Sequence, residues 1–406
     1  MKSDPEDFRR ALLDHFDRRR RPLPWRRERT PYRVMVSEFM LQQTRAETVV
    51  PYYDRWLRRF PGWDALAGAT ADDVLLAWKG LGYYRRARSL HRTAVIVRER
   101  YGGRLPGDPA ELRTLPGVGE YTAGAVASIA FGVPVPAVDG NVKRVLSRLL
   151  DVGDPTAAQL RDEATRLLDP ERPGDFNEAI MELGATVCTP RSPRCHRCPV
   201  RPHCLADKAG TVGSRPLKRR RPPLPRVDYV TAVVVRGGAP VTLLTRRPAT
   251  GLLAGMWEFP TAEIHRHPAG ATAATGAPAS TPSPAATPTR LTAAALELLA
   301  TLGLSGDPVA HPVPVKHTFS HFHATYHPVI VRCDDAADNA SAMPGGTSAV
   351  WIDPDRLDGV ALPVAQQKIG VRLVRRLARG PLRGSPRGIP RLASERADVR
   401  RRVPRG

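Results

Sequence analysis

The sequence predicts two domains of different fold class, an all-α domain followed by an α+β domain. Up to Cys204, apolar residues recur with the spacing of amphipathic helices, and strand-like alternation is nearly absent. From Tyr229 onward, runs rich in β-branched residues appear. Between these regions lies SRPLKRRRPPLPRV, whose four prolines and six basic residues disfavour helix and sheet. A length of 406 residues is sufficient for two domains.

We expect residues 1–212 to form the all-α domain. Three sets of apolar residues predict its helices: Phe8, Leu12 and Phe16; Met35 and Phe39; and Val142, Val145, Leu146 and Leu149. The first two sets recur every four residues, and the third follows the i, i+3, i+4, i+7 rule of a helix with one buried face.

The second domain is expected to span residues 228–378, after a basic, proline-rich linker at 213–227. The expected strands are Tyr229–Val235, Val241–Thr245, Thr318–Thr325, Pro328–Cys333 and Ser348–Ile352, and the expected helices are Leu291–Leu302 and Val364–Leu377. The first two strands are separated by five residues that include two glycines and a proline, which is typical of a hairpin.

Two segments are predicted to be disordered. Residues 268–290 are rich in Ala, Pro, Thr and Gly, and they lack the large apolar side chains whose burial could offset the entropy of ordering. Residues 379–406 contain many arginines with recurrent glycine and proline, and are expected to form a mobile basic tail.

The chain is strongly basic, with a net charge of +22 and a pI near 10.7. Such a charge favours an acidic polymer as partner, and nucleic acid is the obvious candidate, although solvated arginines account for part of the excess. The charged N-terminus has no apolar signal segment, and the most apolar stretch, 121–138, is interrupted by glycines and prolines. A soluble, cytoplasmic protein is expected.

Four of the five cysteines, Cys188, Cys195, Cys198 and Cys204, form a C-x6-C-x2-C-x5-C cluster in a basic loop. Four thiols so close together in a long, cysteine-poor chain indicate a metal centre and not a disulfide framework. The spacing suits a 4Fe-4S cluster and a structural zinc ion equally well. Cys333 lies far away and is expected to be a buried apolar filler.

Two segments of the helical domain have the features of a DNA-binding active site. Gly117 and Gly119, in LPGVG, allow a tight turn whose backbone N–H groups can bind a phosphate at a helix N-terminus; a simple helix–helix turn is the alternative. Asp139 precedes the helix that contains Val142. It is either a functional carboxylate or simply the N-cap of that helix.

Glu38 lies in a mostly apolar helical run, so its carboxyl group either faces solvent or sits in a pocket that raises its pKa. One neutral carboxyl group and one ionised carboxylate are what cleavage through an oxocarbenium-like transition state requires. Glu38 and Asp139 are therefore a candidate catalytic pair.

Six segments together resemble the MutY family of adenine DNA glycosylases, in the helix-hairpin-helix glycosylase superfamily. They are TPYRVMVSEFMLQQT, GLGYYRRARSL, LPGVGEYTAGA, VDGNVKRV, FNEAIMELGATVCTP and the cysteine loop. The resemblance covers residues 8–206 and implies a helix-hairpin-helix fold, one 4Fe-4S cluster, and double-stranded DNA with an A·8-oxoguanine or A·G mispair as substrate. It also implies a monomer associated with the nucleoid.

The same superfamily includes glycosylases of the endonuclease III type, which are also lyases and use a lysine after the hairpin to form a Schiff base. This chain has Tyr121 at that place, and a phenol cannot form an imine. A monofunctional glycosylase is therefore implied, with an endonuclease III-like glycosylase and lyase as the alternative. A noncatalytic iron–sulfur DNA-binding protein is the alternative from another class.

The resemblance also implies residue roles. Glu38 would protonate adenine and later activate water, Asp139 would stabilise the sugar cation, and Tyr121 and Asn141 would support both by hydrogen bonding. The residues that match the adenine pocket are Trp25, Arg26, Leu41 and Glu178. Gln43 and Tyr83 match the wedge that fills the base stack, beside Thr44 and Leu81 near the opposite base.

In the second domain, residues 247–260 and the segment Phe319-Ser320-His321 resemble the Nudix-like C-terminal domain of the same glycosylases. A Nudix hydrolase needs clustered glutamates for Mg²⁺, but after Phe259 only Glu263 precedes the Ala/Pro-rich insertion. A domain that recognises 8-oxoguanine without hydrolysing nucleotides is therefore implied, with Ser320 as the main contact and His321 beside it.

Overall fold

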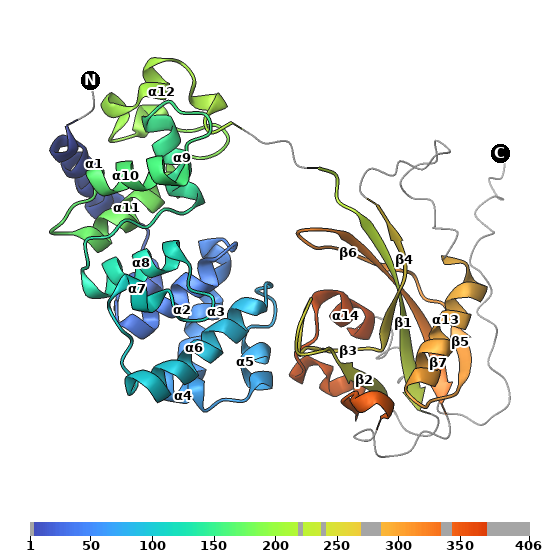
Figure 1. The fold of residues 1–406 in the computed structure, drawn as a ribbon. Helices are drawn as coiled ribbons and strands as arrows, with labels where there is room; N and C mark the ends of the chain where they lie inside the picture. The colour runs from blue at the N-terminus through green and yellow to red at the C-terminus, as the bar shows by residue number, and fades with distance from the viewer. Residues whose placement is uncertain (1–3, 218–221, 237–240, 269–285, 334–342, 372–406) are drawn as a thin grey trace, which may run out of the picture. The chain divides into compact units, whose positions relative to one another are not determined.

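The computed structural model describes residues 4–217, 222–236, 241–268, 286–333 and 343–371 of the chain. The chain divides into two compact units, Met1–Arg221 and Pro222–Gly406 (Figure 1). The first unit is helical and the second contains a sheet with helices, as the sequence predicts. Most of the segment expected to be a disordered insertion, and all of the expected basic tail, lie outside the described residues.

The helical unit contains twelve α-helices in its described part. Their bounds are α1 Pro5–Arg19, α2 Pro31–Leu41, α3 Ala46–Arg59, α4 Trp63–Ala67, α5 Ala71–Ala77, α6 Arg85–Tyr101, α7 Pro109–Leu112, α8 Glu120–Phe131, α9 Gly140–Leu149, α10 Ala157–Leu167, α11 Pro173–Thr186 and α12 Leu205–Lys208. Short 3-10 helices lie at Pro24–Arg26, Cys195–Arg197, Arg201–His203 and Val212–Ser214.

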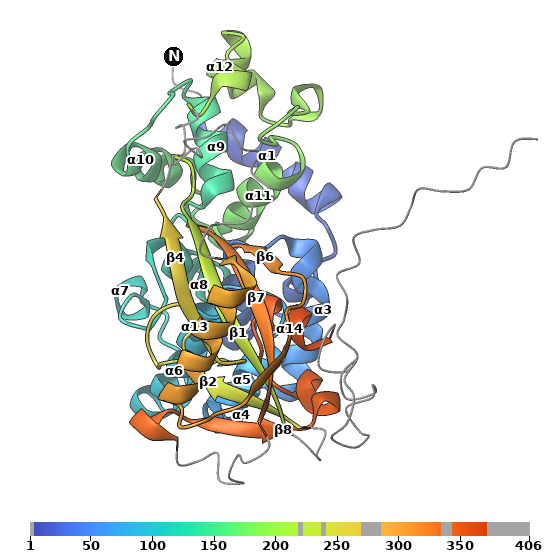
Figure 2. The same cartoon turned by 90° about the vertical axis from the view of Figure 1, so that its right-hand side faces the viewer.

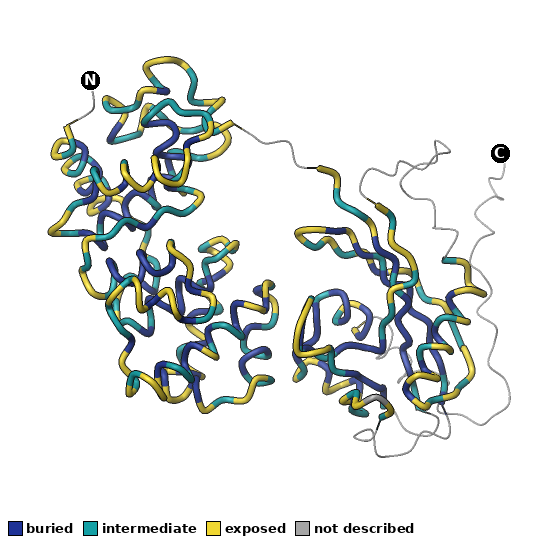
Figure 3. The backbone as a smooth tube through the Cα atoms, in the orientation of Figure 1, coloured by how far each residue is buried: buried dark blue, intermediate teal, exposed yellow. Residues whose placement is uncertain are grey.

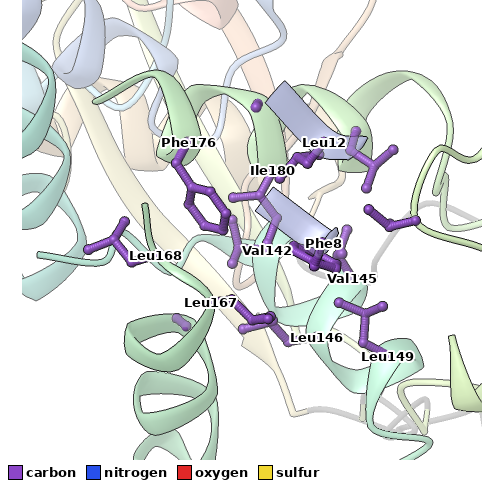
Figure 4. Close-up of a cluster of buried hydrophobic side chains, with 14 of the residues drawn as sticks. Phe8, Leu12, Val142, Val145, Leu146, Leu149, Leu167, Leu168, Phe176 and Ile180 are labelled. Carbon is purple, nitrogen blue, oxygen red and sulfur yellow. The ribbon is translucent and has the colours of Figure 1, made fainter. Parts of the chain in front are cut away.

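The three predicted helical patterns are confirmed in α1, α2 and α9. Helix α1 begins after Asp4, whose carboxylate accepts the N–H of Glu6 in the first turn. Its apolar face is buried, and it packs with α9, α10 and α11 around one core (Figure 4). That core includes Phe8, Leu12, Phe16, Val142, Val145, Leu146, Leu149, Leu160, Leu167, Phe176 and Ile180.

Helix α2 is buried on nearly all sides, because it packs against α3, α6 and α8. Its residues Met35, Val36, Phe39 and Met40 are fully inaccessible to solvent. The buried backbone in Figure 3 follows these helices, whereas the connecting loops are mostly exposed. A polar side chain on α2 therefore has to find its partners inside the protein.

The second unit is built on a mixed, eight-stranded sheet. Its strands are β1 Arg226–Arg236, β2 Thr242–Arg246, β3 Trp257–Glu258, β4 Thr261–His267, β5 Asp307–Ala310, β6 Val315–Thr318, β7 His323–Cys333 and β8 Ala349–Ile352. The order is β3-β2-β1-β7-β5, while β4 pairs with β1, β6 with β7 and β8 with β2. Strands β1 and β7 are parallel, and the other pairs are antiparallel.

Helices cover both faces of this sheet. On one face, α13 Pro288–Thr301 buries Leu291, Ala295 and Leu299 against alternate residues of β1 and β7 (Figure 2). On the other face, α14 Val364–Ile369 packs with Phe259, Leu357 and Leu362. Cys333 is 1% exposed in the first of these cores, as predicted for an apolar filler.

Several predicted elements of the second unit differ in the structure. The single strand expected at Thr318–Thr325 is wrong, because residues 319–322 form a turn; Thr318 ends β6, and residues 323–325 begin β7. Strand β7 instead continues through Pro328, and β3, β4 and β5 were not predicted. Helix α13 begins at Pro288, within the segment expected to be disordered. The expected linker at 213–227 is shorter, since Val212–Ser214 form a 3-10 turn and Arg226 begins β1.

Within the described parts of the chain, no helix is both long and apolar enough to span a bilayer.

Candidate active site

Glu38 and Tyr121 form the centre of a buried polar site in the helical unit. Glu38 lies in the last turn of α2, and only 5% of its surface is exposed. Tyr121, in the first turn of α8, donates a hydrogen bond of 2.7 Å to Oε2 of Glu38. Of the two positions expected for the Glu38 carboxyl group, solvent or a buried pocket, the structure shows the buried pocket.

The surroundings of Glu38 favour its neutral form. Burial raises its pKa from 4.5 to about 7; the hydrogen bond from Tyr121 lowers the pKa, and the charges of Glu178 and Asp139 raise it. The pKa of Tyr121 is itself well above its ordinary value, through burial and the same carboxylates, so its phenol remains a donor. At neutral pH a substantial fraction of Glu38 is protonated, as a general acid requires.

Asp139 is held in one orientation at the start of α9. Its Oδ1 accepts the N–H of Val142 at 2.7 Å, and its Oδ2 accepts the amide group of Asn141 at 3.0 Å. Asp139 is therefore an N-cap, and the same hydrogen bonds fix the second oxygen. Burial raises the pKa of Asp139 above its ordinary value, and these hydrogen bonds and the charge of Arg144 offset only part of that rise.

The structure brings the predicted catalytic residues into one electrostatic environment. The charges of Asp139 and Glu178 both act on Glu38, and Glu38 and Asp139 both act on Tyr121. Asn141 belongs to this group because it hydrogen-bonds Asp139. The pair predicted from two distant motifs is thus assembled from α2, α8 and the N-terminus of α9.

Arg144 connects this group to the cysteine loop. Its Nη2 donates to Oδ1 of Asn141 at 2.9 Å and to the carbonyl of Gly184 at 2.7 Å, and its Nε donates to the carbonyl of Cys188 at 2.7 Å. Gly184 also lies close to Asn141, since a Cβ at this glycine would be 2.7 Å from the Cβ of Asn141. The orientation of Asp139 therefore depends on the backbone of Cys188 through two side chains.

Arg26 and Glu178, two of the predicted adenine-pocket residues, are directly paired. Nε of Arg26 donates to Oε1 of Glu178 at 2.9 Å, and its Nη2 donates to Glu182 at 3.0 Å. Arg29 donates to the other oxygen of Glu178. A carboxylate with two arginine partners retains lone pairs for a further hydrogen bond, so Glu178 can still accept one from a base edge.

The other two predicted pocket residues have apolar surroundings. Trp25 is 6% exposed and contacts Tyr53 edge-on, with ring centroids 5.6 Å apart. Leu41 is half-buried in the same turn of α2 as Glu38. Trp25 is thus largely a core residue.

The predicted wedge residues Gln43 and Tyr83 are both exposed. Both adopt the left-handed backbone conformation, with φ of 58° and 48°. Thr44 is half-buried and Leu81 is buried beside them. Arg86 hydrogen-bonds the hydroxyl of Thr44 and the carbonyls of Gln42, Leu81 and Gly82.

Arg86 was missed at the sequence level. It lies in register with Leu90, Thr93 and Val97, which form the buried face of α6, so the helical periodicity predicts that its side chain faces inward. An arginine on a buried helix face is unusual enough to have been a signal.

The two glycines of the LPGVG segment differ in conformation. Gly117 has φ of 79°, and a Cβ there would lie 2.7 Å from the Cβ of Ser89, so the turn requires glycine at this position. Gly119 is the N-cap of α8 in an ordinary extended conformation, and space is available for a Cβ. Gly119 is an exposed residue at the N-terminus of α8, the position that the phosphate-binding prediction requires.

The four cysteines of the loop line one common pocket, together with Arg148, Val187, Arg201, Asp207 and Val212. Among the described residues, no three Cys, His, Asp or Glu side chains converge closely enough to hold a single metal ion. A zinc ion needs four ligands within about 2.3 Å of one point, whereas a polynuclear cluster needs thiolates spread around a larger volume.

The predicted lesion-contact segment forms the tip of the β6–β7 hairpin in the second unit. Phe319 and Phe322 stack with centroids 4.6 Å apart, and the N–H of Phe319 donates to the carbonyl of Phe322. This packing leaves Ser320 and His321 exposed at the tip. The segment is therefore a hairpin tip with a packed phenylalanine and two exposed polar side chains.

Two of the three glutamates that the structure describes in the second unit are paired with arginines. Glu258 is held by Arg247 at 2.7 Å, Glu263 pairs with Arg266 on β4, and Glu297 is exposed on α13.

Three family models match this chain. Residues 36–170 match the HhH-GPD superfamily of base excision DNA repair proteins, and residues 230–370 match the NUDIX domain. Residues 188–204 match the iron–sulfur binding domain of endonuclease III. The cysteine loop is therefore an iron–sulfur binding loop, which decides between the two metals that the spacing left open.

Three relatives, all named adenine DNA glycosylase, are similar over most of their length. The rat protein is 37% identical over 90% of this chain and 78% of its own. The mouse protein is 38% identical over the same shares. The protein of Mycolicibacterium smegmatis is 46% identical over 50% of this chain and 72% of its own.

Proposed function

Because this chain belongs to the adenine DNA glycosylase family, we propose that it removes adenine from DNA by hydrolysis, with Glu38 as acid and Asp139 as stabilising carboxylate. The main support is that Glu38 is buried, accepts a hydrogen bond from Tyr121 and has a pKa near 7. A carboxyl group with a pKa near neutrality can donate a proton and later accept one.

The reaction begins when Glu38 transfers its proton to N7 of an extruded adenine. The C1′–N9 bond then breaks with its electron pair going to the base, which leaves neutral adenine and a sugar cation. The carboxylate of Asp139, held by Val142 and Asn141, stabilises that cation. The ionised Glu38 then removes a proton from water as the water adds to C1′, which regenerates the acid.

Tyr121 supports a monofunctional route. At this position its phenol hydrogen-bonds Glu38 and can neither form an imine with the sugar nor cleave the strand. This favours the hydrolytic enzyme over the endonuclease III-like glycosylase and lyase. The noncatalytic alternative is disfavoured by the buried acid, which a DNA sensor would not need.

The four cysteines would hold a 4Fe-4S cluster, which would supply rigidity to the loop. Cys188, Cys198 and Cys204 pack against the core of α1, α9, α10 and α11, so cluster binding would fix the loop on that core. Four exposed or half-exposed arginines of the loop, Arg191, Arg194, Arg197 and Arg201, would then face DNA phosphates.

The second unit would recognise the base opposite adenine. Ser320 and His321 stand exposed on a hairpin tip that two stacked phenylalanines hold in place. The three described glutamates of this unit lie on β3, β4 and α13, and two of them are paired with arginines; this supports recognition and not Mg²⁺-dependent hydrolysis. We therefore propose that 8-oxoguanine is preferred over guanine opposite adenine. We also propose that the enzyme acts as a monomer.

Base release from duplexes with adenine opposite 8-oxoguanine, guanine or thymine tests the proposal. We expect strand breaks only after alkali, and only for the first two duplexes. Alkali-independent breaks with a borohydride-trapped adduct would favour the lyase alternative. Release opposite thymine at the same rate would contradict recognition of the opposite base.

A further inference from the structure

Arg86 is a buried cation whose hydrogen-bond partners among the described residues are carbonyls and one hydroxyl, with no carboxylate. Its residue surface is 6% exposed, and burial lowers its pKa to about 10. Removing a guanidinium from water is unfavourable unless many hydrogen bonds replace its hydration. The contacts of Arg86 therefore show what compensates for its burial.

The guanidinium binds the backbone of two segments that are about 40 residues apart. Nη1 donates to the carbonyls of Phe39 at 3.0 Å, Met40 at 2.7 Å and Gln42. Nη2 donates to Oγ1 of Thr44 at 3.1 Å and to the carbonyls of Leu81 at 3.2 Å and Gly82 at 3.1 Å. The cation also lies 5.5 Å from the centroid of the Tyr83 ring.

These contacts link three parts of the site. The carbonyls of Phe39 and Met40 belong to the last turn of α2, which also holds Glu38, so the cation caps that helix end. The carbonyl of Gln42 and the hydroxyl of Thr44 flank the exposed Gln43. The carbonyls of Leu81 and Gly82 directly precede the exposed Tyr83.

Gln43 and Tyr83 each need such support. Both are non-glycine residues with positive φ, a conformation that is unfavourable for a residue with a Cβ and persists only where the surroundings enforce it. The side chain of Arg86 hydrogen-bonds both segments and so links the two loops to each other.

We propose that Arg86 is a positioning residue for base extrusion, which holds the Gln43 and Tyr83 loops as one rigid unit with the helix that bears Glu38. This inference rests on the proposed function, since it assumes that the two side chains enter the base stack. Arg86 itself is buried and touches neither the base nor the sugar. Its loss should therefore impair extrusion of the base and leave the acid–base groups intact.

Arg86→Met and Arg86→Lys test the inference, with Arg85→Met as matched control. Methionine removes the charge and the donors, and lysine keeps the charge but loses the planar fork. Arg85 is exposed on the same helix, so its variant removes one charge beside the same loops without removing the contacts. Thr44→Val removes only one acceptor, and serves if the Arg86 variants do not fold.

Two readouts separate extrusion from chemistry. In a Glu38→Gln background, fluorescence of 2-aminopurine at the adenine position reports unstacking when the duplex binds. With Glu38 present, single-turnover release is compared between adenine in a mispair and adenine in a single-nucleotide bulge, whose extrusion breaks no base pair and therefore costs less.

We expect Arg86→Met to lose most of the fluorescence rise and to slow release from the mispair about 100-fold, because small displacements of positioning groups have such effects. For Arg86→Met, release from the bulge should slow only about tenfold. On the mispair, Arg86→Lys should slow release to an intermediate extent and Thr44→Val only slightly. Arg85→Met should release adenine at the wild-type rate. An unchanged fluorescence rise, or equal losses on both substrates, would overturn the inference. Failure of the wild type to release adenine would instead refute the proposed function.

Discussion

The phenol of Tyr121 donates a 2.7 Å hydrogen bond to Glu38, although 83 residues separate them in the chain. The two side chains meet because α2 and α8 pack against each other, with Glu38 in the last turn of one and Tyr121 in the first turn of the other. Burial by the same helices favours the neutral form of Glu38, while the phenol favours its ionised form. The opposing effects leave a pKa near neutrality, which suits a group that must give up and regain a proton.

Replacing Glu38 by glutamine should abolish adenine release, because an amide cannot supply the proton. We expect the single-turnover rate to fall about 1,000-fold or more. Duplex affinity should stay within about threefold, since phosphate contacts dominate it. Glu28→Gln is the control, because Glu28 is exposed and pairs with Arg33 on the surface. Release by Glu38→Gln at the wild-type rate would exclude the mechanism.

Replacing Tyr121 by phenylalanine should shift the pH dependence of release. The acid must be protonated, so the wild-type rate declines as pH rises through about 7. Without the phenol, the ionised form of Glu38 loses a hydrogen bond, and the declining limb should move about one unit to higher pH. Tyr101→Phe is the control, since the Tyr101 hydroxyl is buried without a hydrogen-bond partner among the described residues. A shift to lower pH would contradict the arrangement.

Glu38 should also destabilise the fold at neutral and alkaline pH. Its pKa is 4.5 when exposed and about 7 when folded, so the folded protein binds more protons between these values and loses stability as pH rises through them. Glu38→Gln should therefore raise the free energy of unfolding by up to about 3 kcal/mol at pH ~8, and by little at pH ~5. Urea unfolding at both pH values measures this. An equal gain in unfolding free energy at both pH values would refute the raised pKa of Glu38. The same gain in Glu28→Gln would also refute it.

Ser320→Ala should weaken discrimination between 8-oxoguanine and guanine opposite adenine. Loss of one hydrogen bond at the exposed hairpin tip should reduce the ratio of release rates about tenfold. Ser348→Ala, at an exposed serine of the same unit, should leave the ratio unchanged. A ratio unaffected by Ser320→Ala would remove Ser320 from the lesion contact.

Cys198→Ser should reduce bound iron at least about twofold and lower the melting temperature, because cluster binding and loop folding are coupled. Cys198 lines the cysteine pocket and packs on the core of the helical unit. Cys333→Ser removes a buried cysteine of the second unit and should retain all the iron. Iron content and visible absorbance of both variants decide the outcome. Full iron in Cys198→Ser would exclude that residue as a ligand.

Local patterns were sufficient to predict much of the helical unit. The spacing of Phe8, Leu12 and Phe16 predicts the buried face of α1, because a helix places every third or fourth residue on one side. The turn at Gly117 and the N-cap at Asp139 are likewise properties of a few adjacent residues. The second unit was predicted less well: β7 continues through Pro328, which pairs with Thr231 of the parallel strand β1, and only the pairing of distant strands decides this.

By itself, the sequence determined the residue types of the site, the cysteine spacing and the order of the two fold classes, because these depend on composition and short-range periodicity. The tertiary structure decided which form of Glu38 is favoured, since burial by α2 and its neighbours and the contact with Tyr121 arise only on folding. It also brought together the hydrogen-bond acceptors of Arg86, which lie on segments that are far apart in the chain. A pKa and a set of hydrogen bonds depend on distances in space, and a linear pattern does not contain those distances.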